Sequence, residues 1–129
     1  MARISCLAAV DIKDILLLGA ALKGAGELAV ETVASIDVTA LQKIRPDVLV
    51  ADVDELEIDA LEILRQLRFV LPDCVIAVYT AVTKPSWGRD CHLAGANCLL
   101  SKEAPESQLT AGLRCAIQSG CFTDPRFAA

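Results

Sequence analysis

The stretch RPDVLVAD, residues 45–52, contains four consecutive apolar residues, which follow Pro46 and Asp47 and precede Asp52. Pro46 cannot continue the helical pattern that precedes it at residues 38–44, so that pattern ends there. The apolar run at 48–51 is short and unbroken, which is typical of a strand buried on both faces of a parallel sheet. Because the run ends at Asp52, the sequence predicts an acidic side chain at the carboxyl end of an inner strand.

Strand-like and helix-like patterns alternate on both sides of this segment. Apolar or alternating runs predict four more strands, at residues 4–10, 28–34, 74–79 and 97–100. Helical spacing predicts five helices, namely one between Asp11 and 24–26 and others at 38–44, 58–71, 85–94 and from Pro105 to Gly120. Five strands alternating with five helices predict an α/β fold with a doubly wound five-stranded parallel sheet that helices cover on both faces.

The composition restricts the classes of protein that remain. The chain has 129 residues, 54% of them hydrophobic, and a mean hydropathy of +0.49, which excludes a disordered segment and fits one domain. No apolar run reaches the roughly 18 residues that cross a bilayer, and no signal peptide is recognisable, so we expect no membrane contact. The net charge is −5 and the basic residues are scattered, so we expect no direct nucleic-acid binding by this domain.

Six cysteines could suggest a disulfide scaffold, but their spacing argues against one. No two of them form a C-x-x-C pair, and Cys6, Cys74 and Cys98 lie within or beside apolar runs, where free cysteine packs as a small hydrophobe. The sequence therefore predicts free thiols in a reducing cytoplasm. Cys91 and His92 are adjacent, but no second ligand pair has the spacing of a metal site, and we prefer a helix-packing role for His92.

Acidic residues are concentrated just after the strand at 48–51. Six of them fall within eleven residues that contain no Lys or Arg: Asp52, Asp54, Glu55, Glu57, Asp59 and Glu62. One interpretation is a solvated loop and a helix start, where negative charge is favourable. The other is a carboxylate pocket for a hard cation, and the cluster alone leaves both interpretations open.

Other inner strands also end in polar residues. In a doubly wound sheet, ligands bind beyond the carboxyl ends of the strands. Asp52, Thr80 and Lys102 each end or follow a predicted strand, so the sequence predicts that an acid, a hydroxyl and an ammonium converge on one rim. The chain contains no G-x-G-x-x-G, P-loop or G-x-S-x-G motif, so its sequence supports neither a dinucleotide site nor a hydrolase elbow.

These residues resemble the receiver domains of two-component response regulators. Residues 45–52 resemble that family's rPDvvllD strand, with Asp52 at the phospho-accepting aspartate, Thr80 at the switch hydroxyl and Lys102 at the lysine after the fifth strand. The separations of 28 residues from Asp52 to Thr80 and of 22 from Thr80 to Lys102 fit the family's ungapped spacing. The segment 120–125 is similar to receivers that precede a LuxR-type helix-turn-helix domain.

The resemblance implies a fold and a site. The fold is the flavodoxin-like (βα)5 receiver fold with the strand order 2-1-3-4-5. The chemistry is phosphoryl transfer, in which Asp52 is the acceptor, Lys102 anchors the phosphoryl group, and Thr80 moves to hydrogen-bond it and carries the signal. Mg²⁺ would be held by Asp52, the carbonyl of Asp54 and Asp11. The chain would be no enzyme beyond self-phosphorylation and dephosphorylation at Asp52.

The resemblance also implies how the chain is organised and what it contacts. Residues 1–120 would form the receiver-like domain, and residues 121–129 a C-terminal tail or the start of a linker to an output domain. A histidine kinase or another signalling protein would be the partner, and the chain would form a homodimer. The last helix and the helix at 85–94, which carries Trp87, would present the contact surface.

This chain departs from the family pattern in four places. Ala9 and Val10 stand where the family has its acidic pair, and residues 55–57 stand where it has the M-P-G motif. Leu99 replaces the switch aromatic, and Glu103 replaces the proline after the lysine. Without the acidic pair Mg²⁺ loses ligands, so we predict an atypical receiver with weak or absent Mg-dependent phosphorylation. It would control a transcriptional output by dimerisation or partner contacts. If Asp11 takes a place in the metal site, the alternative is a fully phosphorylatable receiver. A small flavodoxin-like cofactor-binding protein is the third hypothesis.

Overall fold

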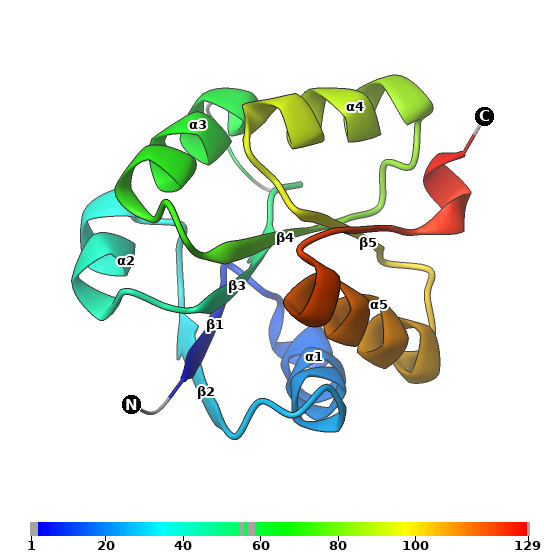
Figure 1. The fold of residues 1–129 in the computed structure, drawn as a ribbon, viewed down its shortest axis with the longest axis horizontal. Coiled ribbons are helices and arrows are strands. Elements are labelled where there is room, and N and C mark those ends of the chain that lie inside the picture. The colour runs from blue at the N-terminus through cyan, green and yellow to red at the C-terminus, as the bar shows by residue number, and fades with distance from the viewer. Residues whose placement is uncertain (1–2, 55, 57–58, 129) are drawn as a thin grey trace.

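The structure is a computed structural model that describes residues 3–54, 56 and 59–128. Strands and helices alternate along the chain (Figure 1). The strands are β1 (Ile4–Ala8), β2 (Ala29–Val33), β3 (Val48–Asp52), β4 (Val75–Thr80), β5 (Cys98–Ser101) and β6 (Phe122–Thr123). The helices are α1 (Ile12–Gly24), α2 (Val38–Ile44), α3 (Ala60–Val70), α4 (Pro85–Ala94), α5 (Glu106–Ser119) and the 3-10 turn η1 (Pro125–Phe127). Within the described ranges, none of the helices is long and apolar enough to span a membrane.

The described strands lie parallel in one sheet with the order β2-β1-β3-β4-β5-β6. The predicted doubly wound sheet and its order 2-1-3-4-5 are therefore confirmed, and a sixth strand is added at the β5 edge. Helices α1 and α5 cover one face of the sheet, and α2, α3 and α4 cover the other (Figure 1). Because β3, β4 and β5 are parallel neighbours, their carboxyl ends lie side by side at one rim.

Two apolar cores, one on each face of the sheet, explain the high hydrophobic content of the chain. Every residue of β3 is buried. Leu49 packs in the core that includes Leu64 of α3, whereas Val50 packs in the opposite core with Leu18 of α1 and Leu113 of α5. Burial of each such side chain contributes about 2 kcal/mol to folding. The sheet is therefore fixed from both sides, and its rim is a rigid base for polar groups.

The end of β1 differs from the prediction. The strand expected to reach residue 10 ends at Ala8, because Ala9 adopts a left-handed conformation with φ 59° and its N–H donates to the Val33 carbonyl at 3.1 Å. Nothing in an apolar run signals a positive φ at an alanine, so the expected bounds are wrong at this end. The chain then turns into α1, where Asp11 is the N-cap as predicted, with its side chain accepting from the Lys13 N–H at 3.5 Å.

Helices α2 and α4 have the predicted bounds, whereas α3 is shorter than expected. The helix predicted at 58–71 is α3, which begins one residue after its N-cap Asp59. Residue 58 of that prediction lies outside the described residues, as do Glu55 and Glu57 of the acidic cluster. The helix-start interpretation of the acids therefore holds for Asp59, whose carboxylate accepts a backbone hydrogen bond in the first turn.

The tail at 121–129 has no periodicity in the sequence, yet its described part packs against the domain. Phe122 and Thr123 form β6 beside β5, and the Phe122 N–H donates to the Asn97 carbonyl at 3.0 Å. Phe127 is buried in the core on the α4 face of the sheet. A strand of two residues is too short to show alternation, so the sequence could not predict it. An output domain beyond the tail stays a prediction.

The six cysteines are free, as the spacing predicts. Cys6, Cys74, Cys91 and Cys98 are buried in the two cores. Burial raises the pKa of Cys6 to about 11 and the pKa of Cys74 and of Cys91 to about 12. These thiols therefore stay protonated at neutral pH and pack as small hydrophobes.

Candidate functional site at the β3–β4–β5 rim

The carboxyl ends of β3, β4 and β5 bring the three predicted site residues together. Asp52 is the last residue of β3, Thr80 is the last residue of β4, and Lys102 directly follows β5. The Lys102 ammonium lies 2.8 Å from Asp52 Oδ2, and the Lys102 backbone N–H donates to the Thr80 carbonyl at 3.0 Å. Asp52 is 2% exposed and Thr80 is fully buried, so a carboxylate, a hydroxyl and a cation form one shielded cluster.

A fourth residue, Asp54, is bound more tightly in this cluster than the sequence indicates. Its Oδ1 accepts the Thr80 hydroxyl at 2.6 Å, and its Oδ2 accepts the Ala81 N–H at 2.8 Å and lies 3.0 Å from the Lys102 ammonium. The resemblance assigned only the backbone carbonyl of Asp54 to the site. The position of Asp54 in the sequence, two residues after Asp52, does not indicate where this loop side chain points.

The loop after β3 explains how Asp54 reaches these donors. The Asp54 N–H donates to Asp52 Oδ1 at 3.1 Å, which is the side-chain-to-backbone bond of an Asx turn. This turn folds the chain back over the rim instead of continuing the direction of β3. On the other side, the Thr80 hydroxyl oxygen accepts the Val82 N–H at 3.1 Å, so Thr80 joins the loop after β3 to the loop after β4.

The charges of the cluster stabilise one another. Burial alone would raise the pKa of the Asp54 carboxyl, but the hydrogen bonds from Thr80 and Ala81 and the Lys102 ammonium outweigh it and hold that pKa below its usual 3.8. Burial alone would lower the pKa of Lys102, but the carboxylates of Asp52 and Asp54 outweigh it and raise that pKa above its usual 10.5. Both groups therefore carry their charges throughout the physiological pH range.

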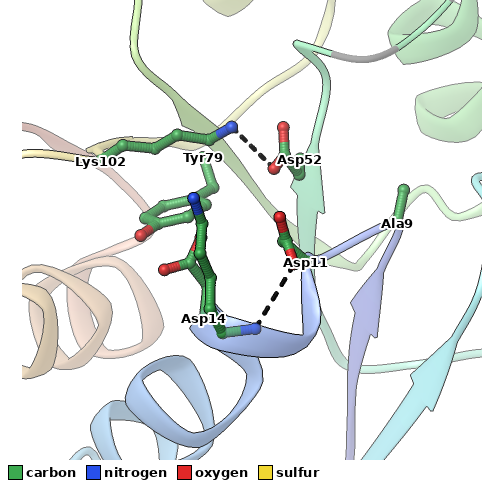
Figure 2. A pocket seen from close by; sticks show the side chains of 7 residues that line it. Ala9, Asp11, Asp14, Asp52, Tyr79 and Lys102 are labelled. Atoms are coloured by element: carbon green, nitrogen blue, oxygen red, sulfur yellow. Dashed lines mark hydrogen bonds and ion pairs between the residues drawn. The ribbon is translucent and has the colours of Figure 1, made fainter.

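An open pocket of about 590 Å³ lies beside this cluster, between the rim and the start of α1 (Figure 2). It is lined by Ala9, Asp11, Lys13, Asp14, Asp52, Tyr79 and Lys102. Figure 2 shows Lys102 extending past the ring of Tyr79 toward Asp52, with Asp11 at the α1 side of the pocket. The structure therefore places the predicted Asp11 near Asp52, while Ala9 contributes no side-chain oxygen.

The residues of the pocket do not fit Mg²⁺ in this arrangement. Mg²⁺ requires octahedral oxygen ligation, with carboxylates free to approach it. Asp52 Oδ2 faces Lys102 and Asp52 Oδ1 accepts the Asp54 N–H, while both Asp54 oxygens accept other donors. Across the part of the chain that the structure describes, no three His, Cys, Asp or Glu side chains are grouped so that they could hold a metal ion.

Tyr79 is a pocket residue that the sequence does not single out, because a tyrosine in an inner strand is usually a core residue. Its ring is fully buried, and the Lys102 ammonium lies 5.8 Å from the ring centre. Among the described residues, its hydroxyl meets no hydrogen-bond partner. Burial raises the pKa of this phenol to about 12, so it is neutral at physiological pH. The neutral ring packs beside the Lys102 ammonium.

Three residues outside the rim, His92, Trp87 and Leu99, have structural contacts. His92 Nδ1 lies 2.8 Å from the Ala96 carbonyl oxygen, and His92 Nε2 lies 2.8 Å from Thr123 Oγ1. His92 therefore joins the end of α4 to β6. Trp87 is half-buried against the core on the α4 face, and Leu99, at the position of the family's aromatic, is fully buried.

Known proteins resemble this chain in both sequence and structure. No family model matches it. The methanol utilization control regulatory protein MoxX from Paracoccus denitrificans is 31% identical over 108 residues, which are 82% of this chain and 48% of that protein. The chain thus spans about half the length of the curated relative that it matches.

Solved response regulators share the fold. The crystal structure of a response regulator from Thermotoga maritima has a TM-score of 0.78 at 21% identity and covers 92% of this chain and 100% of that one. A LuxR-family two-component response regulator from Aurantimonas sp. SI85-9A1 has a TM-score of 0.78 at 18% identity and covers 99% of this chain and 93% of that one. The predicted resemblance is confirmed: the chain has the fold of response-regulator receiver domains, those of LuxR-family regulators among them.

Proposed function

We propose that this chain is an atypical receiver domain of two-component signalling, with Asp52 as the acceptor, Thr80 as the switch and Lys102 as the phosphate anchor. Its Mg-dependent phosphorylation is weak or absent. The observation that carries this proposal is the ion pair of 2.8 Å between Lys102 and Asp52 at the rim, next to an Ala9 that adds no metal ligand. Phosphoryl transfer to a carboxylate depends on positioned cations. This rim supplies one cation, the Lys102 ammonium, but it does not supply the several free oxygen ligands that Mg²⁺ would need.

The partners follow from the same proposal. A histidine kinase or another signalling protein contacts the domain in the cytoplasm, and helices α4 and α5 relay the state of the rim to a transcriptional output through dimerisation or partner contacts. The matched relative MoxX is named as a control regulatory protein, which supports a regulatory role. The domain itself neither binds nucleic acid nor acts as an enzyme beyond its own phosphorylation and dephosphorylation.

Reaction with acetyl phosphate in the presence of Mg²⁺ tests this proposal. The phosphorylated fraction is measured by intact mass for the unmodified protein and for Ala9→Asp, which places an oxygen ligand on the pocket. Ala9 has φ 59°, and aspartate tolerates this left-handed conformation better than most residues, so the variant fits the backbone. We expect slow labelling of the unmodified protein, several-fold more labelling of Ala9→Asp, and none of either after Asp52→Asn.

Two outcomes would contradict the proposal. Rapid and complete labelling of the unmodified protein, lost in Asp52→Asn, would support a fully phosphorylatable receiver instead. If neither Ala9→Asp nor the double variant Ala9→Asp, Asp54→Ala were labelled, the acceptor role of Asp52 would be contradicted.

A further inference from the structure

The Asp54 carboxylate is the shared acceptor for three donors of the rim. Its two oxygens receive a hydroxyl from β4, a backbone N–H from the loop after β4, and an ammonium from the loop after β5, at 2.6, 2.8 and 3.0 Å. Hydrogen bonds to an ionised acceptor are about twice as strong as neutral ones. The side chain is 18% exposed, so water competes weakly for these donors. The donor set is therefore satisfied by an anion that belongs to the chain.

A phosphoryl group on Asp52 would need the same donors. Such a group would be attached to a carboxylate whose Oδ2 is already 2.8 Å from the Lys102 ammonium. In the proposed function, Lys102 anchors the phosphoryl oxygens and Thr80 donates its hydroxyl to one of them. The one O–H of Thr80 is engaged by Asp54, whereas the Lys102 ammonium has three N–H donors and contacts both carboxylates with two of them. A phosphoryl group must therefore displace the Asp54 carboxylate before it can accept the Thr80 hydroxyl.

The chain gives Asp54 an advantage in that competition. Asp54 lies two residues after Asp52, and the bond of 3.1 Å from its N–H to Asp52 Oδ1 holds the loop in the turn that aims its carboxylate at the donors. A tethered anion acts at a high effective concentration, so Asp54 has the advantage over a phosphodonor that arrives from solution and has not yet formed a bond to Asp52. The position of Thr80 is fixed further by its bond from the Val82 N–H.

We propose that Asp54 is an internal substitute for the phosphoryl group, and that it holds Thr80 in the signalling arrangement without phosphorylation. This inference rests on the proposed function, because it assigns the regulation of the same rim. Asp54 is a positioning residue: it touches Thr80, Ala81 and Lys102 and sets where they point. The loop from Thr80 to the start of α4 is thereby fixed in the unmodified protein, and the α4 surface is presented to its partner by default.

Amide resonances of the ¹⁵N-labelled protein test the inference without any reaction. The Ala81 N–H donates to Asp54 in the structure, so we expect its hydrogen exchange to be slow in the unmodified protein. We expect Asp54→Ala to speed Ala81 exchange about tenfold or more and to give Thr80 averaged side-chain couplings. Asp54→Asn retains the shape but keeps one neutral acceptor oxygen in place of two charged ones, so it should be intermediate. This variant separates loss of the anion from a folding defect. Equal Ala81 exchange in all three proteins would overturn the inference.

Binding of beryllium fluoride, a phosphoryl mimic, provides the second measurement. With Mg²⁺ present, we expect Asp54→Ala to bind it about tenfold more tightly than the unmodified protein, because the donors are no longer occupied. The Ala81 resonance of the variant should then return toward its position in the unmodified protein. Equal affinity in both proteins would overturn the inference while leaving the receiver function intact. Slow Ala81 exchange that depends on Asp54, with no beryllium fluoride binding even when Asp54→Ala is combined with Ala9→Asp, would instead contradict the receiver function and leave Asp54 as a purely structural anion.

Discussion

Lys102 balances two carboxylates with one ammonium, and this makes it the residue on which the rim depends. Its nitrogen lies 2.8 Å from Asp52 and 3.0 Å from Asp54, and Asp52 is nearly inaccessible to water. Removing a buried charge partner costs more than the pair itself contributes, because the remaining charge has no compensation.

We therefore expect Lys102→Met to lower the free energy of unfolding by about 2 kcal/mol, as measured by urea denaturation at neutral pH. Combining it with Asp52→Asn should restore much of that loss, because the uncompensated charge is removed. Additive effects of the two substitutions would show that the ion pair is not formed.

Asp54 gives the rim a defined pH dependence. Its pKa in the folded protein lies below the usual 3.8, so the folded state binds the proton less readily than the unfolded chain. The stability that Asp54 contributes is fully present above pH 3.8 and is lost as the pH falls through its folded-state pKa. We expect the difference in unfolding free energy between the unmodified protein and Asp54→Asn to be constant from about pH 5 to 7 and to shrink below pH 3.8. A difference that does not change over this range would contradict the charged network.

At the scale of elements, α5 and β6 pack closely because residue 112 is glycine. A Cβ at Gly112 would lie 2.6 Å from a ring carbon of Phe122, a rigid side chain in the strand at the sheet edge. Gly19 in α1 is the matched control, since a Cβ there meets no atom within 4 Å.

Alanine substitutions at these two helical glycines should have opposite effects on thermal stability. We expect Gly112→Ala to destabilise the domain by about 1–3 kcal/mol through displacement of β6. Gly19→Ala should stabilise it by about 0.5–1 kcal/mol, because alanine favours the helix and the space is free. A Gly112→Ala protein as stable as the unmodified one would show that β6 does not pack on α5.

Elements with strong boundary residues could be predicted from the sequence, and elements without them could not. Pro46 after α2, and Pro85 and Gly95 at the ends of α4, mark helix bounds that the structure reproduces. β1 ends early because of the conformation of Ala9, which depends on its bond to β2 and not on its residue type. β6 exists because Phe122 finds the edge of β5, a contact made only in the folded chain.

At the scale of the whole molecule, parallel topology makes part of the site predictable. Asp52, Thr80 and Lys102 end or follow neighbouring strands, so a parallel sheet brings them to one rim whatever the loops do. The contribution of Asp54 could not be predicted in this way, because it depends on a turn in a loop. The position of Asp54 in the sequence is the same whether the residue is a ligand of Mg²⁺ or a competitor for the donors of the rim.

Phosphoryl transfer to the Ala9→Asp, Asp54→Ala double variant tests most directly whether this rim is a receiver site that Asp54 keeps occupied. Acetyl phosphate and Mg²⁺ are added, and the rate of mass increase is compared with that of the unmodified protein. We expect the double variant to be labelled about tenfold faster or more, with labelling abolished by Asp52→Asn. Labelling that is no faster than in the unmodified protein, or that persists in Asp52→Asn, would contradict the account.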